Sequence, residues 1–336
     1  AKDHPSDEPD EGMSIALTLP SELVGLSNGR KVGENVNGDG TTTTCWEVSY
    51  PINNYLVTFN AGPYVPVEAT YRGVEGDLDE TIVFWAIPEH VAKAKRLWAE
   101  MPGILEVLGR RFGEFPYFAD KFAVVEAPYE GMEHQTLVAY GGDFEPNAFG
   151  FDDLLVHEVA HEWWGNKISV ADWADFWVQE GFATYAEALY VLDTRGEAKY
   201  LEYMRKIARR VRNREPILGA PDAVAAEAYN GDIYSKGACL LHTLKWQLGD
   251  APFFAALHRF ATDERFAHRL VSTADFERLV AEVGGRDIPW FWRRYLRRAE
   301  PPRWTLTRSP AAGPAGRETI ALAWDEAEFE LALPVV

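Results

Sequence analysis

Residues 152–166 read DDLLVHEVAHEWWGN, and the fold of the chain can be inferred outward from this stretch. His157 and His161 are four residues apart, so on a helix their imidazoles lie on one face and can converge on one metal ion. Apolar residues at helical spacing give the stretch a buried side: Leu154, Leu155, Val159 and Trp163. The stretch therefore predicts a helix that carries two metal ligands.

The order of residues in this motif, H-E-x-x-H, favours zinc chemistry. Neutral imidazole is a good zinc ligand, and Glu158 lies one position round the helix, where it can take a proton from a metal-bound water. With 8 His and 52 acidic residues in 336 positions, roughly 0.03 such matches with an acidic second residue are expected by chance. Chance is therefore a poor explanation of the motif.

A catalytic zinc needs a third protein ligand and one open position. Glu180 follows His161 after 18 intervening residues and lies in WVQEGFA, residues 177–183, at the start of a second helical stretch. A short connection between two helices can return this carboxylate to the imidazoles. The alternative is a solvated helix glutamate, which the aromatic neighbours disfavour. Thr184 and Glu187 share its helix face, and either could hydrogen-bond a ligand histidine, although an ordinary core or surface role fits them as well.

These spacings, with three further motifs, resemble the gluzincin metallopeptidases and most closely the aminopeptidase N family, in a bacterial form. Residues 2–6, KDHPS, are similar to a motif near the end of the N-terminal β domain of that family. Residues 131–134, GMEH, resemble its exopeptidase motif, with His134 in place of the usual Asn. Residues 234–238, YSKGA, resemble the segment that carries its catalytic tyrosine.

The resemblance implies a role for each matching residue. One Zn²⁺ would be held by His157, His161 and Glu180, with Glu158 as the general base. Tyr234 would donate its hydroxyl to the oxyanion. Glu133, with Gly131 and Met132, would bind a peptide substrate through its free N-terminal amine.

Three alternatives accompany the aminopeptidase hypothesis. A thermolysin-like endopeptidase would share the zinc ligands and ignore the substrate amine, and the segment 131–134 argues against it. A catalytically inactive binding protein could keep a peptidase fold, although the site would then be expected to have lost one of its residues. An epoxide hydrolase is known in the wider family, but no residue here favours that activity.

The periodicity along the chain predicts an α+β protein in three parts. Residues 1–75 contain short β-like runs, at 14–19, 43–50 and 55–60, with a turn region at 33–40, and would be the end of an N-terminal β domain. Residues 76–300 would form a thermolysin-like domain with a small sheet and a helical bundle. Residues 301–336 would begin a C-terminal β-sandwich-like unit.

Within the central part, residues 81–87, 121–126 and 135–140 are expected to be strands, the last at a sheet edge to which a substrate backbone could add. Residues 88–108 predict one helix. The C-terminal part predicts strands at 304–307, 319–323 and 329–333.

Composition restricts the partners. A net charge of −19 argues against nucleic acid. The basic stretches 205–214 and 293–298 are expected to be solvated helix faces paired with acidic residues. Two cysteines are too few for a thiolate zinc site, and no apolar run has the length of a membrane span. The N-terminus has no signal-peptide character and is interpreted as an interior cut, so localisation stays open.

Overall fold

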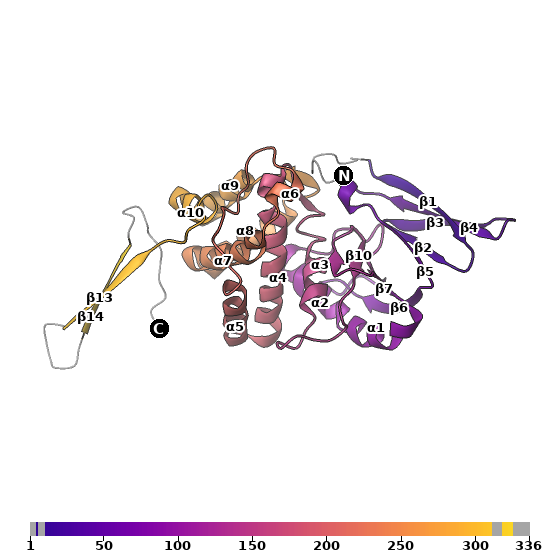
Figure 1. Cartoon of the computed structure of the whole chain (residues 1–336), viewed down its shortest axis with the longest axis horizontal. Coiled ribbons are helices and arrows are strands. Elements are labelled where there is room, and N and C mark those ends of the chain that lie inside the picture. Colours follow the sequence, from indigo (N-terminus) through magenta and orange to yellow (C-terminus); the bar gives the residue numbers. More distant parts are fainter. Residues whose placement is uncertain (1–4, 6–10, 311–317, 325–336) are drawn as a thin grey trace.

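The protein is elongated, with a β-rich N-terminal end, a helical middle and a C-terminal hairpin that projects from it (Figure 1). The structure, a computed structural model, describes residues 5, 11–310 and 318–324. Among the described residues, most strands lie before residue 141 and most helices lie between residues 153 and 295. This arrangement confirms the predicted α+β class.

The N-terminal end consists of two small antiparallel sheets. Three strands are ordered β1–β4–β3 and two further strands, β2 and β5, pair with each other. Their bounds are β1 Met13–Pro20, β2 Val24–Ser27, β3 Arg30–Val36, β4 Thr41–Val48 and β5 Phe59–Gly62. Side chains of β1 alternate between partly buried and exposed, as expected of a strand with one covered face.

Two local expectations in this part were wrong. The run 55–60 was expected to be one strand, but Asn54–Leu56 forms a 3-10 helix and the strand begins at Phe59. The Asn53 side chain accepts a hydrogen bond from the backbone of Tyr55, a turn that competes with strand pairing. The turn region is also shorter than expected, because β3 continues to Val36.

A five-stranded sheet underlies the helical part, in the order β6–β7–β8–β10–β9. The bounds are β6 Val65–Tyr71, β7 Glu80–Ala86, β8 Ala123–Glu126, β9 Gly131–Met132 and β10 Leu137–Tyr140. The expected edge strand at 135–140 is therefore an inner strand, because the two-residue β9 pairs outside it. Since β6 pairs with β7, residues from both sides of position 75 share one sheet, and the proposed boundary there stays a prediction.

The predicted helix 88–108 is divided into three pieces. These are η2 Pro88–His90, α1 Val91–Trp98 and α2 Met101–Phe112. Pro102 lies at the start of α2, and a proline lacks the N–H for an internal helix bond and clashes with the carbonyl four residues earlier. The break before α2 follows from this clash.

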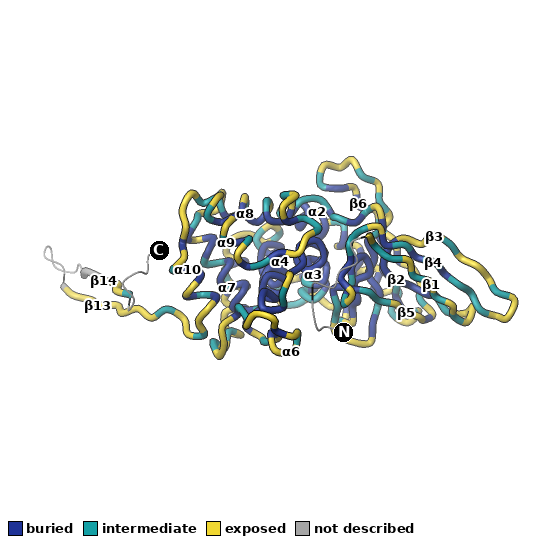
Figure 2. Tube along the Cα trace, turned by 90° about the horizontal axis from the view of Figure 1, so that it is seen from above, coloured by how far each residue is buried: buried dark blue, intermediate teal, exposed yellow. Residues whose placement is uncertain are grey.

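The middle of the molecule is built around α4, Trp177–Arg195, whose residues 177–191 are all buried (Figure 2). A helix that is buried on all sides forms the centre of a bundle. Around it lie α3 Asp153–Ala160, α5 Glu197–Ala208, α6 Ala225–Ala228, α7 Gly231–Leu248, α8 Asp250–Thr262, α9 Thr273–Gly284 and α10 Pro289–Tyr295. Two short strands, β11 Ile168–Val170 and β12 Arg269–Val271, pair in parallel across about a hundred residues, which the sequence did not predict.

The C-terminal hairpin pairs β13, Trp304–Pro310, with β14, Glu318–Trp324. Two of the three strands predicted there are confirmed, and the third, 329–333, lies outside the described residues. Among the described residues, no helix is both long and apolar enough to cross a bilayer. Cys45 and Cys239 are free thiols.

Candidate metal centre

Helix α3 presents the two histidines. Asp152 begins it, since its Oδ1 accepts a hydrogen bond from the backbone N–H of Leu155 at 2.9 Å. The helix is eight residues long, with His157 in its last turn and His161 at its C-cap. Both imidazoles therefore point from the end of one short helix toward α4.

Three side-chain atoms from α3, its C-cap and α4 converge. Nε2 of His157 lies 3.1 Å from Nε2 of His161, and Oε2 of Glu180 lies 3.4 Å from each of these nitrogens. For a tetrahedral zinc with bonds of about 2.0–2.1 Å, the edge between two ligand atoms is about 3.3–3.4 Å. The three atoms are thus spaced as one such ion requires.

The charges in this cluster also suit a cation. Among the described residues, no donor meets the buried Oε2 of Glu180 in hydrogen-bond geometry. Burial would raise the pKa of Glu180, but the two imidazoles outweigh it and hold that pKa well below its usual range. Burial would lower the pKa of His157, but its contacts with Glu180 and Glu187 outweigh it and raise that pKa well above its usual value. The three groups therefore attract positive charge to the space between them.

Further side chains orient each imidazole through its other nitrogen. Nδ1 of His157 lies 2.8 Å from Oε1 of Glu187, and Tyr203 in turn donates a hydrogen bond to Glu187. Nδ1 of His161 lies 2.7 Å from the carbonyl of Trp164. Such partners fix the ring orientation and tautomer of metal-binding histidines. Of the two candidates from sequence, Glu187 makes this contact, whereas Thr184 lines the cleft.

Two glycines bring Tyr234 of α7 to this cluster. A Cβ built on Gly237 would lie 2.9 Å from Cα of Gly181, and one built on Gly181 would lie 3.0 Å from Cα of Gly237. Helices α4 and α7 therefore cross backbone to backbone. The Tyr234 ring stacks on His157 with centroids 5.9 Å apart, and burial, with the Glu180 charge, raises the pKa of its hydroxyl so that it stays protonated.

Glu158 is buried beside the cluster and packs against Gly131. A Cβ built on Gly131 would lie 2.4 Å from Oε1 of Glu158, so β9 can approach this carboxylate only because position 131 has no side chain. Burial raises the pKa of Glu158 to about 7. A carboxylate with such a pKa can both accept and release a proton near neutral pH.

Glu133 is also buried, and its carboxylate lies with Glu158 and His161 in a group whose ligand atoms are within 4.8 Å of one another. Asn166 supports its backbone, donating from Nδ2 to the carbonyl of Glu133 at 3.0 Å and to Glu162 at 3.0 Å. Glu162 also accepts a hydrogen bond from the backbone N–H of Thr136 at 2.8 Å. Neither Asn166 nor Glu162 was predicted from the sequence to support this turn.

A single cleft of about 880 Å³ collects the predicted site residues. It is lined by Gly131, Met132, Glu133, His157, Glu158, His161, Glu180 and Tyr234. A pocket of this size is at the upper end of the range for small-molecule ligands. The cleft can therefore hold a ligand larger than a single amino acid next to the three converging atoms.

Comparison with known proteins identifies relatives of this chain. The Peptidase family M1 domain matches residues 115–295. Human endoplasmic reticulum aminopeptidase 2 is 24% identical over 286 residues, which cover 78% of this chain and 29% of that protein. Aminopeptidase N of Bos taurus is 29% identical over 201 residues, covering 54% and 20% of the two chains. This chain thus spans less than a third of these two relatives.

A solved structure shares most of the fold. It is an M1 zinc metallopeptidase variant from Deinococcus radiodurans bound to a Tyr-Ser-Ala substrate, with a TM-score of 0.73 and 25% identity. The match covers 88% of this chain and 65% of that one.

Proposed function

The chain belongs to peptidase family M1, and from this membership we propose that it is a zinc-dependent aminopeptidase that hydrolyses the N-terminal peptide bond of peptides. The observation that carries the proposal is the convergence of His157, His161 and Glu180 at tetrahedral spacing. The named aminopeptidases among its relatives support the same activity.

In this proposal one zinc ion is held by His157, His161 and Glu180. Glu187 orients the imidazole of His157. When bound, zinc supplies Lewis-acid polarisation of the scissile carbonyl and lowers the pKa of a bound water to about 7. Oε2 of Glu180 is buried and makes no hydrogen bond of good geometry with the described residues, and its neighbours are the two imidazole nitrogens at 3.4 Å. This setting supports its assignment as a ligand, because a buried carboxylate needs a compensating charge.

Glu158 acts as the general base. It accepts a proton from the attacking water as the new C–O bond forms, and it delivers that proton to the amide nitrogen as the C–N bond breaks. No proton is gained or lost over the cycle. Its position next to Gly131 and its pKa of about 7 support this role.

Tyr234 donates a hydrogen bond to the oxyanion that develops on the scissile carbonyl. Its raised pKa keeps the proton on the hydroxyl, and its stacking on His157 supports this role. One such donor contributes about 2.7–4 kcal/mol of transition-state stabilisation.

Glu133 pairs with the free α-ammonium of the substrate and so fixes which peptide bond reaches the reacting groups. An α-ammonium has a pKa of about 7.7–8.0 and is mostly charged at neutral pH, so inside a cleft it needs a counter-charge. Glu133 is buried beside Glu158 and His161. Gly131 and Met132 form the adjoining edge strand β9, along which the substrate backbone can pair.

Metal analysis and turnover separate the ligand role from the base role. We expect His161→Ala to lose most of its zinc, because two protein ligands remain. Glu158→Gln keeps the size of the side chain and should retain zinc while kcat falls by at least about 10²–10⁴-fold. Full zinc content in His161→Ala would refute the ligand assignment.

Blocked substrates test the exopeptidase role. Aminoacyl-anilides and short peptides with a free amine should be cleaved far faster than their N-acetylated forms, because acetylation removes the charge that pairs with Glu133. Glu133→Ala should lower kcat/KM for free substrates and narrow the gap to blocked ones. Internal cleavage of blocked peptides at the rate of free ones would favour the endopeptidase alternative, and zinc binding without any hydrolysis would favour the inactive binding protein.

A further inference from the structure

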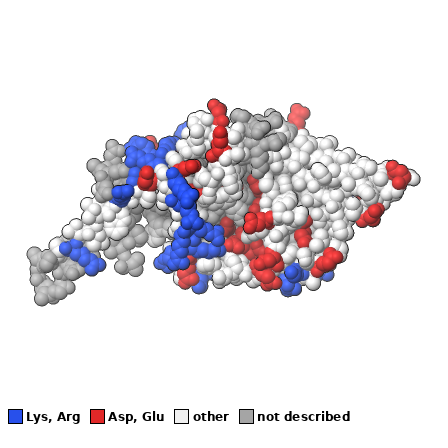
Figure 3. All heavy atoms as spheres, viewed as in Figure 1, with Lys and Arg blue, Asp and Glu red and all other residues white. Residues whose placement is uncertain are grey.

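One wall of the cleft is basic, although the chain as a whole has a net charge of −19. Lys206 of α5 and Arg210 and Arg212 of the segment after it line the cleft together with the proposed catalytic residues. Figure 3 shows a band of Lys and Arg side chains over this region, next to a group of acidic side chains. The local field at this wall is therefore opposite in sign to that of the rest of the cleft.

The two arginines of this wall form no ion pair with the described residues. Lys206 forms an ion pair with Asp153 at 2.8 Å, but among the described residues no carboxylate lies within 4.0 Å of the guanidinium of Arg210 or Arg212. The expectation from sequence that residues 205–214 pair with the acidic remainder therefore holds for Lys206 but not for Arg210 or Arg212.

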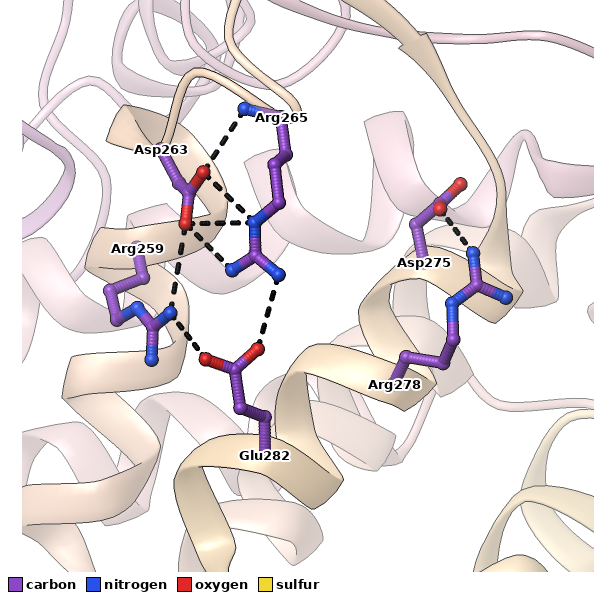
Figure 4. A network of polar contacts seen from close by, with 6 residues as sticks. All are labelled: Arg259, Asp263, Arg265, Asp275, Arg278 and Glu282. Carbon is purple, nitrogen blue, oxygen red and sulfur yellow. Dashed lines mark hydrogen bonds and ion pairs between the residues drawn. The ribbon is translucent and has the colours of Figure 1, made fainter.

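Arginines elsewhere in the molecule show the contrast. In Figure 4, Arg265 pairs with both Asp263 and Glu282, and Arg259 pairs with Glu282 at 2.6 Å. This network is solvent-exposed, and among the described residues the equally exposed Arg209 forms no ion pair. What distinguishes Arg210 and Arg212 is therefore their place in the lining of the cleft.

The segment that carries these arginines is held in place. The backbone N–H groups of Arg212 and Asn213 donate to the two carboxylate oxygens of Asp232, at 2.7 and 2.6 Å. Asp232 is buried and lies on α7, two residues before Tyr234. The basic wall is thereby tied to the helix that carries the proposed oxyanion donor.

The basic wall and the amine-binding carboxylate belong to different parts of the site. Glu133 groups with His161 and Glu158. On the side of the wall, the ammonium of Lys206 lies 4.9 Å from the centre of the Tyr203 ring, and Tyr203 donates a hydrogen bond to Glu187, which contacts His157. A peptide with its ammonium at Glu133 and its first peptide bond at the metal ligands must continue past them. Its downstream residues, each spanning about 3.3–3.6 Å when extended, then run toward the wall.

We propose that Arg210 and Arg212 form a carboxylate-binding subsite for the part of the substrate that follows the scissile bond. The inference rests on the proposed aminopeptidase activity and adds a substrate class to it: short peptides with an anionic downstream end. The carboxylate is either the free C-terminus of a di- or tripeptide or the side chain of an Asp or Glu residue. A guanidinium fork matches the geometry of either group.

Matched substrates distinguish the two sources of the carboxylate. Ala-Ala-Ala and its C-terminal amide differ only in the free C-terminal carboxylate. Ala-Ala-Asp amide and Ala-Ala-Asn amide differ only in the side-chain carboxylate. Alanine anilide, which has no carboxylate, is the reference substrate. We expect one or both anionic members to have a kcat/KM about 5- to 20-fold higher than the neutral partner. This preference should shrink as salt rises.

Variants that change the charge at positions 210 and 212 test whether these arginines cause the preference for anionic substrates. Arg210→Gln/Arg212→Gln should abolish it and leave alanine anilide hydrolysis unchanged, and Arg210→Glu/Arg212→Glu should reverse it. Arg209→Gln is the matched control, because Arg209 is exposed on the same segment but does not line the cleft. In the Glu158→Gln background, the Kd of uncleaved Ala-Ala-Ala should rise when the two arginines are replaced by glutamine.

The outcomes separate this inference from the proposed function. If wild-type protein does not cleave alanine anilide or any free peptide, the aminopeptidase proposal is wrong. If it cleaves them but treats anionic and neutral partners equally, and the double variants match wild type in rate and in peptide Kd, the subsite is wrong and the activity stands.

Discussion

Gly131 lacks a side chain at the point where β9 packs against the Glu158 carboxylate, so Gly131→Ala tests how closely that carboxylate is positioned. The new Cβ would lie 2.4 Å from Oε1, and the flexible Glu158 side chain must move. We expect kcat/KM to fall by about 10²-fold, as a displacement of about 1 Å can cause. Zinc content and the unfolding temperature should change little, since no backbone atom is displaced.

Gly103→Ala is the matched control for this variant. Gly103 lies within α2, and a Cβ built there meets no atom within 4 Å. It should be active and more stable by about 0.5–1 kcal/mol, because alanine favours the helix. Wild-type kcat/KM in Gly131→Ala would show that Glu158 does not need its observed position.

At the scale of residues, the sequence predicted what depends on local spacing. His157 and His161 share a helix face because they are four apart, which needs no knowledge of the fold. Glu162 lies next to His161 in the same stretch, yet its role depends on the backbone of Thr136, which belongs to another part of the chain. The position of Arg210 could not be predicted either, because only the folded structure shows that it lines the cleft without a carboxylate partner among the described residues.

At the scale of elements, the crossing of α4 and α7 depends on two facing glycines, and Gly237→Ala tests it. The added Cβ would lie 2.9 Å from Cα of Gly181, and a backbone atom cannot move aside as a side chain can. The helices must separate, so we expect a loss of about 1–3 kcal/mol in the free energy of unfolding. Catalysis should fall as well, because Tyr234 moves away from the proposed metal ligands.

Urea midpoints and kcat/KM measured on the same preparation check this prediction. Gly231→Ala is the control for stability, since it lies at the start of α7 where a Cβ built on the backbone meets nothing within 4 Å. Its urea midpoint should equal or exceed that of wild type. A Gly237→Ala variant as stable and active as wild type would show that the close crossing is not required.

Elements defined by local patterns were predicted from the sequence, whereas pairings between distant segments were not. The alternation along β1 and the apolar spacing along α3 are local, and both elements were predicted. The edge position of β9 and the parallel pairing of β11 with β12 arise from contacts between distant segments. Neither leaves a periodic pattern in the sequence, so the inner place of β10 could not be anticipated.

At the scale of the whole molecule, the N-terminal sheets hold the turn that carries Glu133, the proposed amine-binding residue. Nδ2 of Asn28 donates to the carbonyls of Gln135 and Leu56, at 2.6 and 3.0 Å, and its Oδ1 accepts from the backbone of Thr58 at 2.7 Å. The backbone N–H of Gly29 donates to Oγ1 of Thr136 at 2.8 Å. We therefore propose that the N-terminal part, residues 1–75, serves the catalytic part, 76–300, by fixing the segment that follows Glu133. In the C-terminal part, 301–336, the described residues 301–310 and 318–324 make none of these hydrogen bonds.

Asn28→Ala tests this coupling. The side chain is fully buried. Its removal leaves three backbone groups without this partner, two buried and one half-buried, which costs about 2–4 kcal/mol in the free energy of unfolding. Hydrogen exchange should accelerate at Thr58 and in the small N-terminal sheets, and stay slow in α4. Because Gln135 follows Glu133 closely in the chain, kcat/KM for free-amine peptides should fall while zinc content is unchanged.

The same variant should also reduce the preference for free over acetylated substrates, because Glu133 is no longer held in register. Asn35→Ala is the control: its amide makes one exposed hydrogen bond, to Asn37 at 2.7 Å, so stability and substrate preference should both match wild type. If Asn28→Ala lost stability but kept the full preference for free amines, the N-terminal sheets would stabilise the molecule without positioning Glu133. The local support from Asn166 and Glu162 would then be sufficient, and Asn166→Ala should in that case produce the loss of preference that Asn28→Ala did not.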